Sequence, residues 1–241
     1  VPLGVWTFAV AAPFFTVEDA VTMDDLRSTW DGVPSGPFVA HGLLMSEDTQ
    51  RALTSLMGDP AEGAVEIVAA SELLTTATST DGWALVPFHR LTPQWKVLRL
   101  DGVSLVEKGL TPQTGYPLEV MIYAGSAART DALAIITGID DSLTNREESE
   151  MTVVVMTGVT AMTRATARLM DTKGITYPAK DIRHWFSDAD FVHISNEVSF
   201  KPDCVAEGSG SLSFCSHDSY IALLEEINAN AESMLKQVKA F

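Results

Sequence analysis

The residues best placed for binding chemistry follow two predicted strands in the second half of the chain. The apolar, β-branched run at 151–158 predicts a buried strand, and the run at 191–194 predicts a second strand. In open α/β sheets, ligands collect outside the carboxyl ends of the strands. The segments 158–164 and 195–197 lie just beyond these two ends and contain the candidate ligand-binding residues Arg164, Ser195 and Asn196.

The other polar groups give weaker signals. None of the five histidines forms a ligand pair at helical spacing, and the chain has no P-loop, nucleophile elbow, dinucleotide-binding glycine fingerprint or zinc-protease motif. Asp188 and Asp190 stand two positions apart and could hold a hard cation if both lie on one face of a strand. The alternative for this pair is a solvated turn. The glycines and serine at 208–210 indicate a flexible turn rather than a phosphate cradle.

Two cysteines, Cys204 and Cys215, are separated by ten residues. Two thiols in one short segment fit a single disulfide, which indicates an exported protein, at the cell surface or extracellular. The alternative is a pair of buried free thiols. A zinc site is disfavoured because neither cysteine belongs to a Cys-x2-Cys pair.

The composition is that of a folded, acidic protein. Hydrophobic residues make up 46% of the 241 residues and charged residues only 20%, which argues against disorder. The 16 Lys and Arg against 32 Asp and Glu give a net charge of -16, which argues against nucleic acid as a partner. No apolar stretch approaches the roughly 20 residues that a transmembrane helix needs.

The first part of the chain, residues 1–138, alternates predicted strands with predicted helices, which is the order of an α/β domain. Thr22 and Ser46 are positioned to cap two helices, and the second of these helices ends at Gly58. The polar, acidic segment 139–150 then predicts a linker between two domains. The alternative is one long loop inside a single domain.

The second part, residues 151–241, predicts the order strand, helix, strand, helix, with one sheet edge left open. Ser216 is positioned to cap a final amphipathic helix of about 24 residues. The apolar stripe of this helix consists of Tyr220, Leu224, Ile227, Ala231, Met234, Val238 and Phe241. The open edge and the stripe predict a homo-oligomer; the alternative for the helix is packing onto its own sheet.

Three motifs follow one another between residues 151 and 228. A strand that ends in Gly158 is followed by Arg164, then by Ala189-Asp190-Phe-Val-His-Ile-Ser195-Asn196-Glu197, and then by a helix-like segment from Phe214. This order resembles the start of the CapA-type poly-gamma-glutamate capsule synthesis proteins, which belong to the calcineurin-like metallophosphatase group. The resemblance implies a partial metallophosphatase-like α/β domain in a cell-surface protein related to capsule synthesis.

The departures from this family pattern concern the metal ligands. Val159 stands where the family has the Asp of Gly-Asp, and Ser195 stands where it has an Asn, whereas Glu197 matches the family's Glu. No Asn-Asn-His segment follows Asn228. A metal site needs several converging ligands, and valine cannot coordinate a cation. We therefore expect no metallohydrolase activity and no cofactor, with Glu197 as the residue left to contact a divalent metal.

A second resemblance covers residues 5–123. The segments 16–32, 83–88 and 116–118 resemble landmarks of type 2 periplasmic solute-binding proteins, in particular the phosphate-binding-like ones. That resemblance implies anion binding by backbone N–H groups at helix starts, which the acidic first turns behind Thr22 and Ser46 oppose. The alternative functions are therefore a module that binds a small ligand or an anionic polymer, and a self-associating assembly protein that uses the C-terminal helix.

Overall fold

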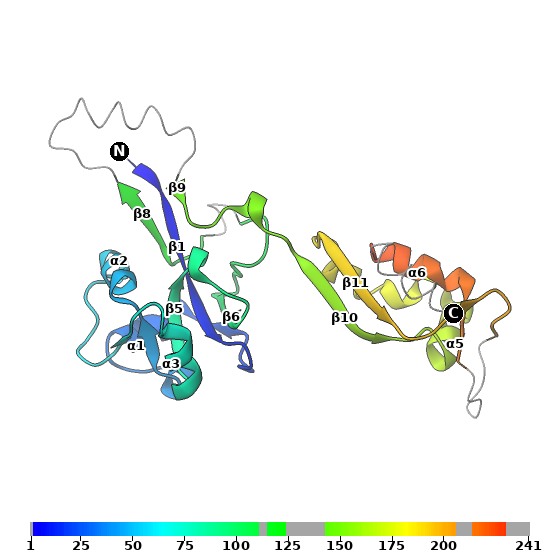
Figure 1. Cartoon of the computed structure of the whole chain (residues 1–241), viewed down its shortest axis with the longest axis horizontal. Coiled ribbons are helices and arrows are strands. Elements are labelled where there is room, and N and C mark those ends of the chain that lie inside the picture. Colours follow the sequence, from blue (N-terminus) through cyan, green and yellow to red (C-terminus); the bar gives the residue numbers. More distant parts are fainter. Residues whose placement is uncertain (1, 111–114, 124–142, 206–213, 230–241) are drawn as a thin grey trace. The chain divides into compact units, whose positions relative to one another are not determined.

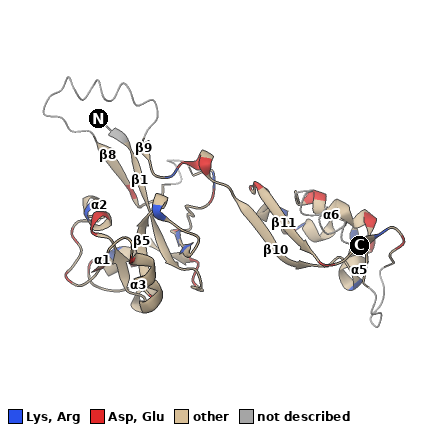
Figure 2. Cartoon of the chain, in the orientation of Figure 1, with Lys and Arg blue, Asp and Glu red and all other residues tan. Residues whose placement is uncertain are grey.

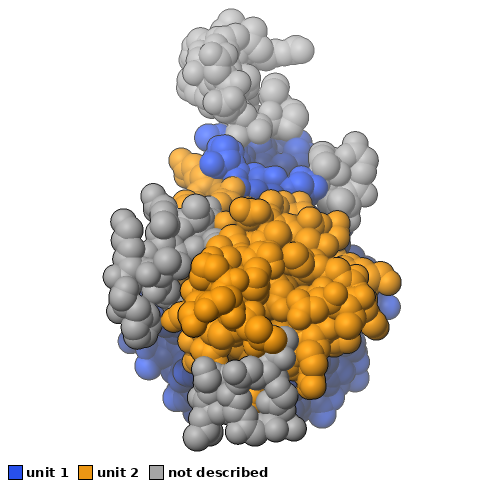
Figure 3. Space-filling view, turned by 90° about the vertical axis from the view of Figure 1, so that its right-hand side faces the viewer, with its two compact units in different colours: residues 1–149 blue, residues 150–241 orange. Residues whose placement is uncertain are grey.

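The computed structural model describes residues 2–110, 115–123, 143–205 and 214–229. The chain divides into two compact units, Val1–Ser149 and Glu150–Phe241, which are coloured separately in Figure 3. Each unit has a hydrophobic core of its own.

The first unit is built around β1 (Pro2–Pro13), the long strand at the centre of its sheet (Figure 1). β1 runs antiparallel to β5 (Trp83–Pro87), β6 (Trp95–Val97) and β8 (Glu119–Tyr123). Beyond β5 the sheet continues with β3 (Leu43–Met45), which is parallel both to β5 and to β4 (Glu66–Ile67). The fold class is mixed α/β, as predicted, with antiparallel pairs at the centre of the sheet.

Helices accompany this sheet where the sequence predicts their caps. α1 (Met23–Trp30) and α2 (Glu47–Met57) begin after Thr22 and Ser46, whose side chains accept hydrogen bonds from the third N–H group of each helix. Both predicted caps are therefore confirmed. Gly58 ends α2 at a φ of 81°, a backbone conformation that favours glycine. The remaining elements of this unit are α3 (Leu73–Thr80), η1 (Gly36–Val39), η2 (Phe88–Arg90) and the parallel pair β2 (Ala20–Val21) and β7 (Arg99–Leu100).

The core of the first unit surrounds the middle of β1, where residues 8–12 are at most 2% exposed. The large side chains packed there include Leu26, Trp30, Leu53, Trp83 and Leu85. The indole nitrogen of Trp30 donates a hydrogen bond to the carbonyl oxygen of Gly58 (3.1 Å). The end of α2 therefore satisfies the one polar atom that the burial of Trp30 in α1 removes from water.

The predicted linker needs correction at residues 143–149, which belong to the first unit. β9 (Leu143–Thr144) pairs in parallel with β1. The next residue, Asn145, is buried, and its side-chain amide makes two hydrogen bonds to the backbone of Thr7 in β1. A polar segment in a sequence indicates exposure to solvent. Here, however, the side-chain amide of Asn145 continues the hydrogen bonding between β9 and β1. The first residues of the predicted linker, 139–142, lie outside the described residues.

Arg146 makes a second attachment of this segment to the first unit. Its guanidinium donates to the carbonyl oxygens of Leu105 (2.9 Å) and Glu107 (2.6 Å) and pairs with Glu148 (3.3 Å). The acidic turn η3 (Glu148–Glu150) follows, and its glutamate residues are red on the ribbon in Figure 2. Three of the five acidic residues of the predicted linker, Glu147, Glu148 and Glu150, thus lie at the boundary between the two units.

The second unit contains the parallel strands β10 (Val154–Thr160) and β11 (Phe191–Asn196), with α5 (Arg164–Lys173) between them in the chain (Figure 1). The predicted order of strand, helix and strand is confirmed. The other elements are η4 (Tyr177–Ala179), η5 (Arg183–Trp185), the parallel pair β12 (Phe200–Lys201) and β13 (Ser216–His217), η6 (Asp218–Tyr220) and α6 (Ile221–Glu226).

The prediction of a buried strand at 151–158 is wrong. In β10, Val154, Met156 and Val159 are 53%, 70% and 68% exposed. Among the described residues β10 pairs with β11 alone, and only Val155 of this strand packs against the core of the unit. The β-branched residues of β10 therefore indicate that the segment forms a strand, and they do not indicate that the strand is buried.

The prediction of one long C-terminal helix is also wrong over its described part. α6 has six residues, and Asn228, two residues after its end, adopts a φ of 56°. Ser216 does not cap a helix but lies in β13, where its buried hydroxyl donates to the carbonyl oxygen of Met162 (3.0 Å). The apolar stripe beyond Ala229 lies outside the described residues.

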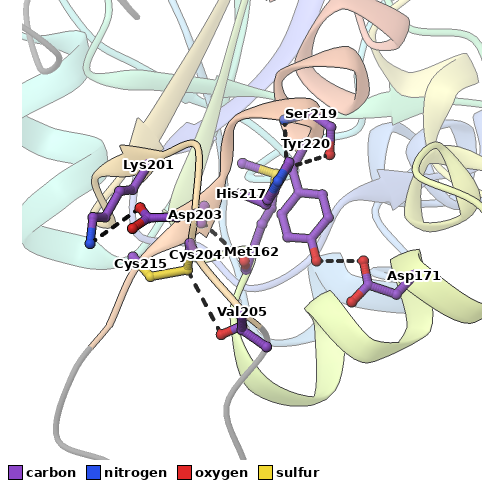
Figure 4. The surroundings of a disulfide bond; sticks show 11 residues. Met162, Asp171, Lys201, Asp203, Cys204, Val205, Cys215, His217, Ser219 and Tyr220 are labelled. Carbon is purple, nitrogen blue, oxygen red and sulfur yellow. Dashed lines mark hydrogen bonds and ion pairs between the residues drawn. A yellow bond between two sulfur atoms is a disulfide. The ribbon is translucent and has the colours of Figure 1, made fainter.

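The predicted disulfide between Cys204 and Cys215 is confirmed, which excludes the alternative of free thiols (Figure 4). It joins the residues that follow β12 to those that precede β13, with the two Cα atoms 5.9 Å apart. Beside it, the hydroxyl of Tyr220 donates to Asp171 (2.7 Å), and burial together with this carboxylate raises the pKa of Tyr220 to about 12. In the described parts of both units, no helix combines the length and the apolar character needed to cross a membrane.

Candidate ligand-binding site

The first unit contains a cavity of about 370 Å³. Its walls come from β1, α2, β8 and the turn that follows β5. The apolar residues of the lining are Trp6, Phe8, Ala52, Pro87, Val120 and Ile122, and the polar ones are Ser46, Asp48, Thr49, His89 and Arg90.

A smaller cavity of about 180 Å³ adjoins the first, since both are lined by Ser46, Pro87 and Arg90. Its remaining walls come from the segment between β4 and α3, from α3 itself and from the segment that leads into β6. Ser71 and Thr92, two residues with hydroxyl groups, belong to this lining. Arg90 is therefore shared by a larger, mostly apolar cavity and a smaller, more polar one.

The parallel pairing of β3 and β5 explains why these residues converge. Ser46 directly follows β3, and η2 directly follows β5, so both lie at the same edge of the sheet. That edge, outside the carboxyl ends of parallel strands, is where ligands bind in open α/β sheets. α2 also begins there, and the positive end of its dipole adds to the field at Ser46.

The charges at this edge are unequally engaged. Arg51 pairs with Glu47 (2.9 Å) and Asp48 (3.1 Å), so the acidic first turn of α2 is partly neutralised on the helix itself. Arg90, in contrast, makes no hydrogen bond or ion pair with another described residue. The acidic first turn of α2 therefore opposes an anion less strongly than the sequence indicates. The planar, positively charged guanidinium of Arg90 belongs to the lining of both cavities.

His89 is held in place by two neighbours. Its ring meets that of Trp6 edge to face, with the centroids 5.2 Å apart. Its Nδ1 atom lies 3.5 Å from the amide nitrogen of Asn145. Partial burial, followed by the charge of Arg90, lowers the pKa of His89 below its usual value.

We expect this lowered pKa to make the first unit less stable in acid. The pKa of His89 is lower in the folded chain than in the unfolded chain, so between these two values the unfolded chain binds more protons. The free energy of unfolding therefore rises with pH through this window. Equally, it falls when the solution is acidified below about pH 6.5. His89→Asn should flatten the fall in urea midpoint between about pH 7 and 5, whereas His184→Asn in the second unit should not. An NMR titration that places the pKa of His89 above about 6.5 would contradict this prediction.

The residues that the sequence predicts as a site lie in the second unit, and three of them come together there. Ser195 and Asn196 end β11 beside Val159 and Thr160 of β10. The N–H group of Glu197 donates to the carbonyl oxygen of Thr160 (3.2 Å). Asn196 donates to Val198, and its buried Oδ1 has no partner among the described residues. The carboxyl ends of the two strands thus meet as expected, but the binding role of these residues stays a prediction.

Arg164 is placed differently from the other predicted residues. It begins α5 at a φ of 48°, and its guanidinium lies 4.5 Å from the centre of the Phe214 ring. A cation over an aromatic face is an attractive contact in itself. The geometry therefore gives Arg164 a partner within its own unit, and a role in ligand binding stays untested.

The predicted metal contact at Glu197 also stays a prediction. In the described ranges, no three His, Cys, Asp or Glu side chains converge on a common point. Asp190 accepts a hydrogen bond from the N–H group of Val153 (2.7 Å) and precedes β11, so Asp188 and Asp190 do not stand together on a strand. The glycine-rich segment 208–210 lies outside the described residues.

The cavity residues of the first unit are not among the site residues that the sequence predicts. Trp6 and Arg90 stand out only once the order of strands is known, because they come from β1 and from the turn after β5. The available signal was the polar pair His89-Arg90 directly behind the apolar run at 83–88, at the carboxyl end of a strand.

No protein-family model matches the chain, and no curated protein matches it. Similar solved structures include an ABC-type phosphate transport receptor from Vibrio cholerae, at 13% identity and a TM-score of 0.45, over 58% of this chain and 66% of that one. A putative phosphate ABC transporter substrate-binding protein from Clostridium perfringens is similar at 14% identity and a TM-score of 0.41, over 57% of this chain and 63% of that one. The chain thus spans less than two thirds of either structure. Likeness at this level carries no functional argument, so the function has to be argued from the geometry of this chain.

Proposed function

We propose that the first unit is a small-ligand-binding module and that the chain works outside the cytoplasm. The observation that carries this proposal is the pair of adjoining cavities at the carboxyl ends of β3 and β5, with Arg90 in the lining of both. Small-molecule sites are concave, mostly apolar and supplied with a few polar groups that fix orientation. The larger cavity, about 370 Å³, falls within the range of about 300–1,000 Å³ that such sites occupy.

The polar contacts of the cavity favour binding over catalysis. The hydroxyl of Ser46 is engaged with Thr49 (3.0 Å) and caps α2. The described contacts of His89 are with Trp6 and Asn145. A nucleophile and its base need to lie within hydrogen-bond reach of one another, and the described contacts pair Ser46 and His89 with other groups.

The disulfide supports the extracytoplasmic part of the proposal. Structural disulfides persist in oxidising compartments and are rare in the cytosol, where thiols are kept reduced. Cys204 is 8% exposed, so this bond is part of the packed second unit rather than a surface adduct.

For the second unit we keep, as a proposal, the relation to CapA-type capsule synthesis proteins without metallohydrolase activity. Its support is the arrangement of Val159 and Glu197 around the ends of β10 and β11, where an aliphatic side chain takes the place of a metal-binding carboxylate. A chromogenic phosphodiester incubated with the chain and manganese should show no turnover. Metal-stimulated hydrolysis would contradict this part of the proposal.

The binding module predicts that a small ligand stabilises the first unit through Arg90. We expect at least one of four probes (inorganic phosphate, phenyl phosphate, phenylacetate and benzyl alcohol) to raise the melting temperature measured by scanning calorimetry. At a hundredfold excess over the dissociation constant, the gain is about 2.7 kcal/mol. For an anionic probe, Arg90→Gln should remove most of this shift, whereas Arg168→Gln removes the same charge from the second unit and should not. If no probe shifts the transition at any concentration, the proposal fails.

A further inference from the structure

We propose, building on the binding function above, that the ligand is a small organic acid: an oxyanion head on an apolar, planar body. The two cavities differ in chemistry, and they adjoin at one cation. A ligand that spans both has to carry an anionic group at one end and an apolar group at the other.

The larger cavity fits the apolar body. Six of its lining residues are apolar, and they come from β1, α2, β5 and β8. Aromatic side chains stack on planar groups at low cost in conformational entropy, and Trp6 supplies such a ring. A bare inorganic oxyanion would leave this wall unfilled, so its shape favours an organic ligand.

The smaller cavity fits the anionic head. Ser71 and Thr92, which carry hydroxyl groups, belong to its lining together with Arg90. Hydroxyl donors and a guanidinium match the acceptor oxygens of a carboxylate or a phosphate, and the planar fork of arginine can bind two of these oxygens at once. The start of α2 adds a positive dipole end behind Ser46.

The neighbouring charges are compatible with this orientation. Asp48 lines the larger cavity, but its carboxylate already pairs with Arg51 (3.1 Å). Partial burial and the charge of Arg90 lower the pKa of His89, which favours the neutral ring over a second cation. Arg90 is therefore the group that recognises the head, and loss of its charge should be felt by anionic probes alone.

Isothermal titration calorimetry of the full chain tests this assignment with the same four probes. We expect phenyl phosphate or phenylacetate to bind at least about tenfold more tightly than inorganic phosphate, which lacks the body, and than benzyl alcohol, which lacks the charge. Arg90→Gln should weaken the aromatic acids about 10- to 100-fold and leave benzyl alcohol unchanged. Arg168→Gln should change neither.

A variant that fills the larger cavity tests the binding of the apolar body separately from the binding of the anionic head. Ala52→Phe should weaken the aromatic acids at least about tenfold and leave inorganic phosphate unchanged, with Ala165→Phe on α5 as the matched control. If Ala52→Phe fails to fold by circular dichroism, Val120→Phe fills the same cavity from β8.

Each alternative result has a defined meaning. If inorganic phosphate binds as tightly as the aromatic acids and depends on Arg90, the binding module stands and the organic acid is overturned. If benzyl alcohol binds as tightly as the acids, the role of the charge is overturned. If none of the probes binds, both the inference and the proposed function are overturned.

Discussion

Replacing Asn145 with leucine should lower the free energy of unfolding of the first unit by about 2–6 kcal/mol. The amide of Asn145 accepts a hydrogen bond from the N–H group of Thr7 (2.7 Å) and donates one to its carbonyl oxygen (2.8 Å). Both residues are buried, at 8% and 2% exposure. Leucine leaves two buried backbone groups of β1 without partners, and each such group costs about 1–3 kcal/mol.

Urea denaturation followed by tryptophan fluorescence measures this effect. Four of the five tryptophans, Trp6, Trp30, Trp83 and Trp95, belong to the first unit, so the signal reports mainly on that unit. Glu147→Gln, at an exposed site two residues away, is the control and should change stability by less than about 0.5 kcal/mol. A loss of less than about 0.5 kcal/mol for Asn145→Leu would show that residues 143–149 are not held to β1 as described.

The same variant connects the edge of the sheet to the cavity. The amide nitrogen of Asn145 lies 3.5 Å from His89, and Arg146 lies over the ring of Phe88 at 5.6 Å. Both contacts hold the η2 turn that carries Arg90. We therefore expect Asn145 to act as a positioning residue for the proposed site, so that its replacement weakens an anionic probe even in the fraction of molecules that stay folded.

Removing the disulfide should have the second large effect, confined to the other unit. The double variant Cys204→Ser, Cys215→Ser opens a loop of sequence separation 11, and closing a loop of this size stabilises a fold by about 2–4 kcal/mol. The bond tethers β12 to β13, and β13 leads directly through η6 into α6, which supplies Leu223 and Leu224 to the core. We expect β13 and α6 to lose protection first.

Hydrogen exchange followed by mass spectrometry resolves this prediction along the chain. Peptides that cover β13 and α6 should exchange faster in the double variant, since local opening costs less free energy there. Peptides from β1 and β5 serve as the internal control and should keep their rates. Equal exchange of both units in variant and parent would contradict a stabilising role for this bond.

Features set by neighbouring residues were predictable from the sequence. The caps of α1 and α2 depend on Thr22 and Ser46, each of which bonds a backbone group three residues away. The disulfide was also predictable, because two cysteines in one short segment have few other partners. These contacts need no knowledge of the tertiary fold.

Features set by distant residues were not predictable. Asn145 meets Thr7 across 138 positions, and nothing in the acidic segment around it indicates that its amide is buried. The long C-terminal helix failed for a related reason: the apolar period continues past Asn228, but the backbone turns to a positive φ at that residue. Periodicity indicates which face of a helix is apolar, and it cannot locate the residue at which the helix ends.

The candidate site shows the same division. Ligands tend to bind beyond the carboxyl ends of strands, which predicts Ser195 and Asn196 at the end of β11. The end of β11 does lie beside the end of β10. The same tendency applies equally to Ser46 and Arg90, but the sequence does not reveal that β3 and β5 are parallel neighbours. Ser46 was therefore recognised as a helix cap and not as part of a cavity lining.

A crystal structure of the full chain with 4-bromophenyl phosphate would test the binding site most directly, because bromine gives an anomalous signal that marks the body of the ligand. We predict a bromine peak in the larger cavity beside Ala52 and Val120, with the phosphate oxygens within hydrogen-bond distance of Arg90. A structure in which the compound occupies another surface, while both cavities of the first unit stay free of it, would contradict the account.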